Sequence, residues 1–238
     1  MRRFESSRPN QPRRRFRLWH LLPLLLLGSA PLPGLGPQEA RALVDPAVPP
    51  WSALARLQIP GVARCTAVLI GRRTALTAAH CLWNPRVGHF VPADTVHVLS
   101  QYQHGGFTGH AIATSYRLAP GHDVALVTLA APIGTVPLAL APLPASGTPA
   151  MLGGYNQDRQ EVIEADTECR VLATDGVRIR HDCAATHGTS GAPLLVQGKD
   201  GIWRVAGIQS AAFIAMRGGI AVATAALQAW IATSGDAP

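Results

Sequence analysis

Apolar residues recur along the chain in short runs, many of them alternating with polar residues, and turn-forming residues separate these runs. A period of two is typical of β-strands that bury one face. The pattern predicts a first set of strands at 53–59, 64–71, 74–77, 95–100, 107–116 and 124–129. Beyond a Pro-rich connection at 131–148, it predicts a second set at 149–155, 161–172, 177–181, 192–197, 203–210 and 219–224. The sequence therefore predicts an all-β protein with two sets of strands.

The composition agrees with this prediction. The 238 residues suffice for two small β domains or one large one, and a hydrophobic content of 47% supports a proper core. The 23 Gly and 20 Pro residues favour turn-rich β structure over helices.

The formal net charge of +7 comes mainly from the N-terminal segment. Eight basic residues and only two acidic residues precede residue 43, and the basic ones are Arg2, Arg3, Arg8, Arg13, Arg14, Arg15, Arg17 and Arg41. The remainder has 13 basic and 12 acidic residues, a net charge of +1. Binding to nucleic acid requires a concentration of positive charge, so this nearly neutral remainder predicts no nucleic-acid partner.

The N-terminal segment has the pattern of an export signal. An Arg-rich start precedes an apolar stretch at 18–27, which Pro23 interrupts, and small residues follow up to Ala42. The stretch is too short to span a bilayer comfortably, which favours a signal peptide over 1–42, cleaved after Ala42. A retained anchor is the alternative, and the arginine cluster at 13–15 leaves general secretory or twin-arginine export open. We expect a secreted or periplasmic protein without a stable membrane anchor.

Three short segments carry the candidate chemistry. His80 ends the run LTAAHC at 76–81, Asp123 opens the apolar run DVALVTL at 123–129, and Ser190 lies in the Gly-rich segment GTSGAP at 188–193. A serine hydroxyl is a poor nucleophile at neutral pH, so it needs a base within hydrogen-bonding reach. His80 is the candidate base, and Asp123 would stabilise the imidazolium. Gly188 would permit a turn that points the amides of Gly188 and Ser190 at an oxyanion.

These segments resemble those of the chymotrypsin-like (trypsin-like) serine endopeptidases. The resemblance covers most of the chain after Trp51 and includes 65–70, the cleft strand at 207–210, the final strand at 218–221 and a closing helix at 225–233. It implies two six-stranded antiparallel β-barrels with a cleft between them and a C-terminal helix. The expected divisions are leader and first barrel 43–137, linker 138–147, second barrel 148–224, and helix with tail 225–238.

Chain order separates this resemblance from two other hydrolase folds. An α/β-hydrolase requires its His after its Ser, but all nine histidines precede Ser190, and Ala192 breaks the Gly-x-Ser-x-Gly pattern. A subtilisin requires its Asp before its His, and Asp45 is the one Asp before His80. The resemblance then implies an endopeptidase that acts on proteins or peptides as a monomer without a cofactor. The alternative is a protease-like binding module that does not cut.

Four cysteines fit an exported protein with two disulfides. The resemblance implies that Cys65, sixteen residues before Cys81, pairs with it, and that Cys169 pairs with Cys183. A zinc site is the competing use of cysteine, but neither Cys-x-x-Cys nor His-x-x-x-His spacing occurs in the sequence. We therefore expect no metal site.

Departures from the family pattern concern activation and specificity. Thr189 replaces the Asp that vertebrate members carry before the nucleophile, and the usual Ile-Val-Gly-Gly start is missing. The chain is thus more similar to the bacterial glutamyl-endopeptidase-like branch, and leader removal with folding should suffice for activity. Ala184, followed by Ala185, stands where tryptic members place a carboxylate, and Gln209 replaces the His of glutamyl members, which implies an uncharged pocket for a small or apolar residue. The expected substrate contacts are Ala184, Ala185, His187, Ser210, Ala211 and Ala212.

Two groups of polar residues have ordinary interpretations. The acidic cluster at 158–168 alternates along a predicted strand, which favours a solvated face over a calcium site. The histidines His89, His97, His104, His110 and His181 are scattered and are expected at the surface or in turns. His187, three residues before Ser190, is either a substrate contact or simply exposed.

Overall fold

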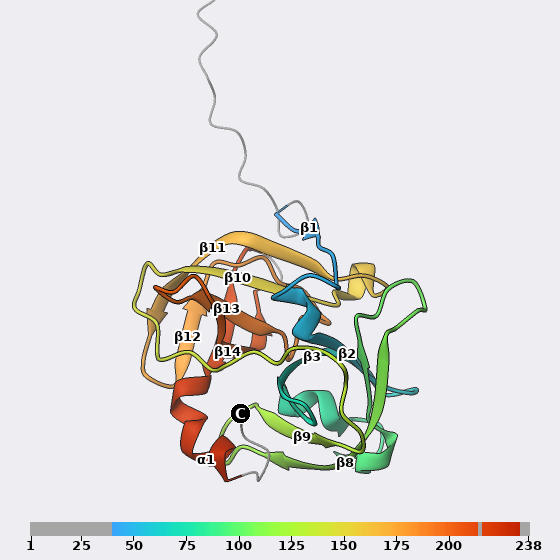
Figure 1. The fold of residues 1–238 in the computed structure, drawn as a ribbon. Coiled ribbons are helices and arrows are strands. Elements are labelled where there is room, and N and C mark those ends of the chain that lie inside the picture. Colours follow the sequence, from blue (N-terminus) through green and yellow to red (C-terminus); the bar gives the residue numbers. More distant parts are fainter. Residues whose placement is uncertain (1–39, 214–215, 234–238) are drawn as a thin grey trace, which may run out of the picture. The chain divides into compact units, whose positions relative to one another are not determined.

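The computed structural model of the protein describes residues 40–213 and 216–233 (Figure 1). The predicted signal peptide, except for its last three residues, and the predicted tail at 234–238 lie outside the described residues. Among the described residues, no helix has the length and apolar character needed to cross a membrane.

The first set of strands closes into a six-stranded antiparallel barrel. Its order is β2 (Leu54–Ile59), β3 (Ala63–Gly71), β4 (Thr74–Thr77), β9 (Ala125–Leu129), β8 (Gly109–Leu118) and β7 (His97–Ser100), and β7 pairs with β2 to close the ring. All six predicted strands are present, and the largest shift is a displacement of β8 by two residues from the predicted 107–116.

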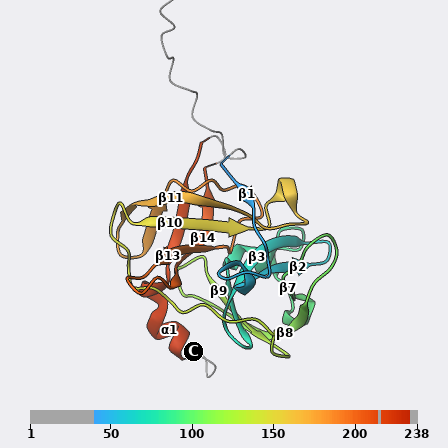
Figure 2. The ribbon, with the colours of Figure 1, turned by 45° about the horizontal axis from the view of Figure 1, so that its top comes forward.

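The second set closes in the same way. The order is β11 (Glu164–Thr174), β10 (Pro149–Gly154), β13 (Pro193–Gln197), β14 (Trp203–Ala212), β15 (Gly219–Ala223) and β12 (Arg178–His181), with β12 paired back to β11. Figures 1 and 2 show β10, β11, β13 and β14 as a group distinct from β2, β3, β8 and β9. The predicted architecture of two six-stranded barrels is confirmed.

Short elements complete the described chain. Strand β1 (Ala42–Leu43) adds to the outer edge of β11, and β5 (Trp83–Asn84) pairs with β6 (His89–Phe90). Single 3₁₀ turns are η1 (Trp51–Ala53), η2 (Ala79–Leu82), η3 (Ala93–Thr95) and η4 (Gln157–Arg159). The closing segment is a 3₁₀ turn η5 (Thr224–Leu227) followed by the helix α1 (Gln228–Ala232).

Alternation along the strands of the first barrel divides its apolar side chains between two cores. Leu57 and Leu69 point into the barrel, whereas Leu54, Val68 and Leu76 face a larger core that the two barrels share. This shared core also receives residues of the second barrel and the closing segment, namely Met151, Leu195, Val205, Leu227 and Ile231. Because each buried Leu or Ile contributes roughly 1.5–3 kcal/mol, the shared core holds the barrels against each other and fixes the seam between them.

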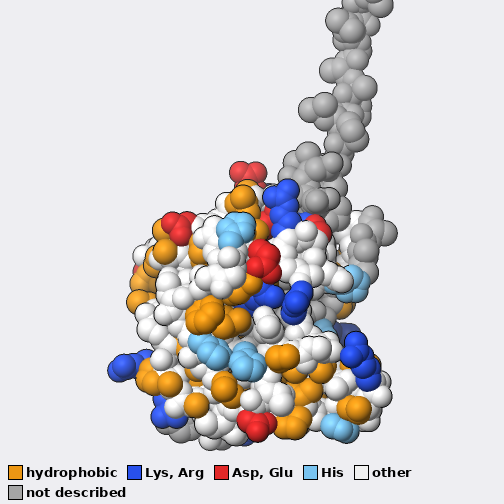
Figure 3. All heavy atoms as spheres, turned by 90° about the vertical axis from the view of Figure 1, so that its right-hand side faces the viewer, with side chains coloured by type: hydrophobic (Ala, Val, Ile, Leu, Met, Phe, Trp, Pro, Cys, Tyr) orange, Lys and Arg blue, Asp and Glu red, His pale blue; other side chains and the backbone are white. Residues whose placement is uncertain are grey.

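The predicted linker at 138–147 forms hydrogen bonds with both barrels. The amide of Leu138 donates to the carbonyl of Leu69 in the first barrel over 2.9 Å, and the amide of Ala141 donates to that of Val205 in the second over 2.8 Å. On the face drawn in Figure 3, Arg, acidic and His side chains are interspersed with hydrophobic ones, and no single sign of charge covers it.

Candidate active site

His80 lies in η2, directly after β4 of the first barrel, where two atoms of the residue contact one carboxylate. Its amide donates to Asp123 Oδ1 over 2.8 Å, and its Nδ1 lies 2.7 Å from Asp123 Oδ2. Because a carboxylate accepts hydrogen bonds, this geometry assigns the ring proton to Nδ1. Nε2 is then left as the basic nitrogen of a half-exposed imidazole.

Asp123 precedes β9 and receives a further hydrogen bond from the second barrel. Ser210 Oγ on β14 donates to Asp123 Oδ2 over 2.5 Å. Burial by itself would raise the pKa of Asp123, but the hydrogen bonds from His80 and Ser210 outweigh burial and hold the pKa below its ordinary value. The carboxylate is therefore ionised at neutral pH, behind the ring that it orients.

Ser190 lines the same cavity as His80. The cavity has a volume of about 460 Å³, and His187 and Gly188 also line it. Among the described residues, no hydrogen bond joins Ser190 Oγ to the imidazole. Such bonds are often long in free enzymes and tighten when the substrate is bound. The structure thus joins His80 to Asp123 directly and brings Ser190 to the same cavity.

The backbone amides around Ser190 differ in whether they donate to acceptors within the described residues. The amides of Thr189, Gly191 and Ala192 donate to the carbonyls of Thr186, Gln209 and Thr189. In the described part of the chain, the amides of Gly188 and Ser190 donate to no protein acceptor. Amides left free in this way beside a serine hydroxyl can stabilise an oxyanion.

Glycine is required on both sides of this turn. Gly188 and Gly191 have φ values of 87° and 81°, a region that disfavours side chains. A Cβ at Gly188 would collide with the Tyr155 carbonyl oxygen, and one at Gly191 would collide with that of Thr66. The sequence reasoning found the first requirement but not the second.

Thr66 on β3 binds the loop that contains Ser190 across the seam, a role that the sequence did not reveal. Its amide donates to the Ser190 carbonyl over 2.9 Å, and its Oγ1 donates to the Gly188 carbonyl over 3.1 Å. The same Oγ1 accepts from the Tyr155 amide over 2.9 Å. Thr66 is fully buried, so these bonds form without competition from water. We call this set of bonds the Thr66 clamp.

Thr189 also stabilises the loop. Its Oγ1 lies 2.5 Å from the Thr186 carbonyl oxygen and 3.1 Å from Asn156 Oδ1, and it accepts from the Thr186 amide over 2.9 Å. Thr189, at the position of the Asp in vertebrate relatives, therefore holds the loop before Ser190 through hydrogen bonds between uncharged groups.

Most of the predicted pocket residues do not line the 460 Å³ cavity. Ala184 and Ala185 are buried, and Ala211 and Ala212 pair with β15. None of these four residues, nor Ser210, is among the residues that line the cavity. His187 is the one predicted specificity residue that lines it, in an exposed position.

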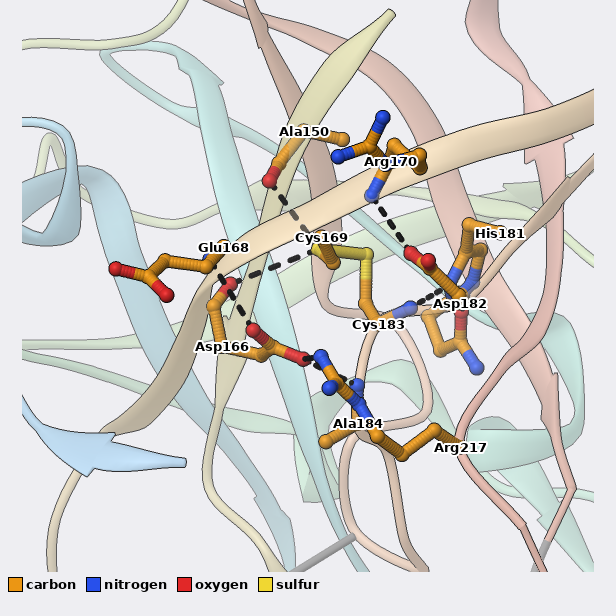
Figure 4. The surroundings of a disulfide bond; sticks show 11 residues. Ala150, Asp166, Glu168, Cys169, Arg170, His181, Asp182, Cys183, Ala184 and Arg217 are labelled. Carbon is orange, nitrogen blue, oxygen red and sulfur yellow. Dashed lines mark hydrogen bonds and ion pairs between the residues drawn. A yellow bond between two sulfur atoms is a disulfide. The ribbon is translucent and has the colours of Figure 1, made fainter. Parts of the chain in front are cut away.

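A buried acidic residue supports the loop that contains Ala184 (Figure 4). Asp166 on β11 accepts from the Ala184 amide over 2.8 Å and from Arg217 Nη2 over 2.6 Å. Asp166 and Glu164 are both buried, so the interpretation of the acidic cluster as a solvated face was wrong for these two residues. Each faces inward because an arginine pairs with it: Arg217 pairs with Asp166, and Arg41 pairs with Glu164.

His181 is also buried. The sequence analysis had expected it at the surface or in a turn, and that expectation was wrong. Its Nε2 lies 2.7 Å from Gln209 Oε1, and its Nδ1 accepts from the Cys183 amide over 3.2 Å. Burial lowers the pKa of His181, so the ring is neutral and donates from Nε2. Gln209 in turn donates to the Ala211 carbonyl over 2.8 Å.

Both disulfides that the resemblance implied are present. Cys65–Cys81 joins β3 to η2 beside His80, and Cys169–Cys183 joins β11 to the loop before Ala184 (Figure 4). Among the described residues, the two groups of side chains that could hold a metal each contain one of these pairs. Oxidised sulfur is not a thiolate ligand, so neither group is a cysteine-based metal site.

Two closed antiparallel barrels, with a histidine and a carboxylate on one side of the seam and a serine on the other, define the chymotrypsin-like class of fold. The family model described as "Trypsin-like peptidase domain" matches residues 65–208, and the chain belongs to this family.

A solved structure, described as "Structure of Glu endopeptidase in complex with MPD", is similar with a TM-score of 0.71 and 19% sequence identity. The match covers 83% of this chain and 97% of that chain. It shows a shared fold and agrees with the predicted similarity to the glutamyl-endopeptidase-like branch.

Proposed function

We propose that the protein is an exported serine endopeptidase that cleaves peptide bonds through an acyl-enzyme, with His80, Asp123 and Ser190 as its triad. One observation carries the proposal. An ionised Asp123, held by Ser210, orients an imidazole whose free nitrogen shares a cavity with Ser190 and with two unpartnered amides. Family membership supports the same reaction class.

In the proposed reaction, Ser190 Oγ attacks the peptide carbonyl while His80 Nε2 takes its proton. The amides of Gly188 and Ser190 stabilise the oxyanion. Loss of one such donor typically lowers kcat by roughly 10²–10³. His80 then protonates the departing amine and activates the water that releases the acyl group. Asp123 stabilises the imidazolium in both steps.

The expected specificity and activation rest on the loop before Ser190 and on the end of β14. Ala184, Ala185, Ala211 and Ala212 offer no charge to the residue before the scissile bond, and Asp166 balances the charge of the nearby Arg217. We therefore propose an uncharged primary pocket. Because Thr189 and Asp166 already hold the loop, removal of the leader should suffice for activity.

Active-site labelling tests the proposal. A sulfonyl fluoride should label the native protein at Ser190, abolish its hydrolysis of casein and leave Ser190→Ala unlabelled. Ser146→Ala, at an exposed serine, is the matched control and should label normally. A correctly folded protein that binds peptides but is neither labelled nor able to cleave them would instead be the protease-like binding module.

A further inference from the structure

The cavity beside Ser190 is not lined by the alanines of the predicted primary pocket. Its walls include the turn between β2 and β3 at 59–64 together with Tyr155, Gln157 and Gln160. His80, which must protonate the leaving amine in the proposed reaction, lines the cavity, whereas Ser210 and its neighbours on β14 do not. The cavity therefore lies on the side of the leaving group, the part of the substrate that follows the scissile bond.

The charged side chains that line this cavity are two arginines, Arg56 and Arg64, and none of its lining residues is Asp or Glu. The two arginines differ in how their charge is balanced.

The charge of Arg56 is balanced within the protein. Arg56 is buried, its Nη1 lies 3.0 Å from Glu161 Oε1, and its guanidinium stacks 4.1 Å from the centre of the Tyr102 ring. Tyr102 donates to the other oxygen of Glu161 over 2.5 Å. The hydrogen bonds from Tyr102 and Arg56 hold the pKa of Glu161 below its ordinary value, so the pair is ionised at neutral pH. Arg56 therefore serves mainly to support the cavity wall.

The charge of Arg64 is offset less directly, by a longer-range Coulomb attraction to Glu161 that also helps to lower the pKa of that carboxyl. Arg64 is exposed, and its Nη1 donates to the neutral side-chain oxygen of Gln160. No carboxylate of the described residues lies within ion-pairing distance of its guanidinium. Gln160 is itself held by a bond of 3.0 Å from its Nε2 to the Gln157 carbonyl. A neutral neighbour thus orients Arg64 at the cavity and leaves most of its five donors free.

We propose that Arg64 selects substrates with an acidic residue among the first three after the scissile bond. This inference rests on the proposed function, because it identifies the cavity as the leaving-group side. A guanidinium with free donors binds a carboxylate through two parallel hydrogen bonds, and the same positive charge disfavours Lys or Arg at that place.

Binding to a form that cannot cleave separates this inference from catalysis. Pentapeptide amides with a free amino terminus, alanine throughout except for one Glu, Gln or Lys at the first, second or third position, are titrated into ¹⁵N-labelled Ser190→Ala protein and followed by NMR. At one position, the Glu peptide should bind about three- to fivefold more tightly than its Gln counterpart, the range of a partly exposed ion pair. The Lys peptide should bind more weakly than the Gln peptide.

Two variants and one control assign the effect to Arg64. Adding Arg64→Gln should bring the ratio of Glu to Gln affinities close to one, and Arg64→Glu should reverse the ranking in favour of Lys. Arg180→Gln removes the same charge from an exposed position on β12 outside the cavity lining, and it should preserve the ratio.

Equal binding of the Glu, Gln and Lys peptides, or no binding of any of them, would overturn this inference. Either result leaves the proposed function to be judged by the labelling experiment. Conversely, a Glu preference that depends on Arg64 in a protein that never reacts with the sulfonyl fluoride would support the acidic subsite and count against hydrolysis.

Discussion

Replacing Arg41 with alanine should destabilise the protein strongly, although Arg41 lies far from the proposed triad in the sequence. Its side chain is 1% exposed, and its Nη2 and Nη1 lie 2.5 Å from Asp158 Oδ2 and 3.6 Å from Glu164 Oε2. Glu164 Oε2 is buried and accepts no hydrogen bond from the described residues. Removing Arg41 would therefore leave Glu164 with Arg159 as its remaining ion-pair partner, over 3.3 Å.

The expected loss in the free energy of unfolding follows from this geometry. Breaking a fully buried ion pair by removing one partner costs about 3–5 kcal/mol. Arg159 would still offset part of the charge of Glu164, and the Asp158 side chain is 34% exposed. A loss of about 2–3 kcal/mol is therefore expected for Arg41→Ala at pH 7.

Acid should reduce this loss. Arg41 holds the pKa of Asp158 below its ordinary value, whereas burial raises the pKa of Glu164 despite Arg41 and Arg159. The Asp158 contribution is present above its unfolded pKa and is lost as pH falls through the folded pKa, and an isolated Glu164 charge disappears on protonation. The difference between the variant and the native protein should thus shrink below about pH 4.

Urea unfolding followed by circular dichroism at pH 7 and at about pH 3 measures both effects. Arg180→Ala, at an exposed position, is the control and should lie within about 0.5 kcal/mol of the native protein. If Arg41→Ala were as stable as this control at pH 7, the reasoning from burial would be refuted.

The same contacts bear on the predicted cleavage of the leader. Cleavage after Ala42 would remove both Arg41 and Ala42, which pairs with Ala165 on β11. Because this loss would destabilise the second barrel, we now expect cleavage before Arg41. The intact mass of the exported protein measures the site directly, and a chain that begins at Leu43 would contradict this expectation.

Three further substitutions test the site. Ser210→Ala removes a hydrogen bond to the ionised Asp123, which should lower kcat/KM about tenfold without loss of folding, as peptide kinetics and circular dichroism would show. Gly191→Ala introduces a Cβ at positive φ against the backbone of β3 and should cost more than about 2 kcal/mol of stability in thermal unfolding. Asp166→Asn leaves Arg217 without its counter-charge, which should lower the stability and loosen the pocket loop, so KM should rise more than kcat falls. Adding Arg217→Gln should restore part of the stability.

The sequence predicted the strands well because alternation is a local property. A two-residue displacement of β8 is the largest difference in the first barrel, and β4 has the predicted bounds. His80, Asp123 and Ser190 could be proposed from the sequence because each lies in a segment with its own pattern, so the proposal required no knowledge of their partners.

Features that depend on distant partners were missed. Glu164 and Asp166 follow the alternation of an exposed strand face, but Arg41 and Arg217, far away in the chain, allow them to be buried. His181 is buried because Gln209 on another strand accepts its proton. No local signal marks such pairs, since it is the folded chain that brings them together.

Through the Thr66 clamp, both halves of the chain hold the proposed nucleophile in place. Ser190 belongs to one barrel, but the strand that fixes its carbonyl belongs to the other. If the polypeptide were divided within 138–147, neither fragment alone would hold the serine in position. Peptide hydrolysis would therefore report whether two separately produced fragments had reassembled.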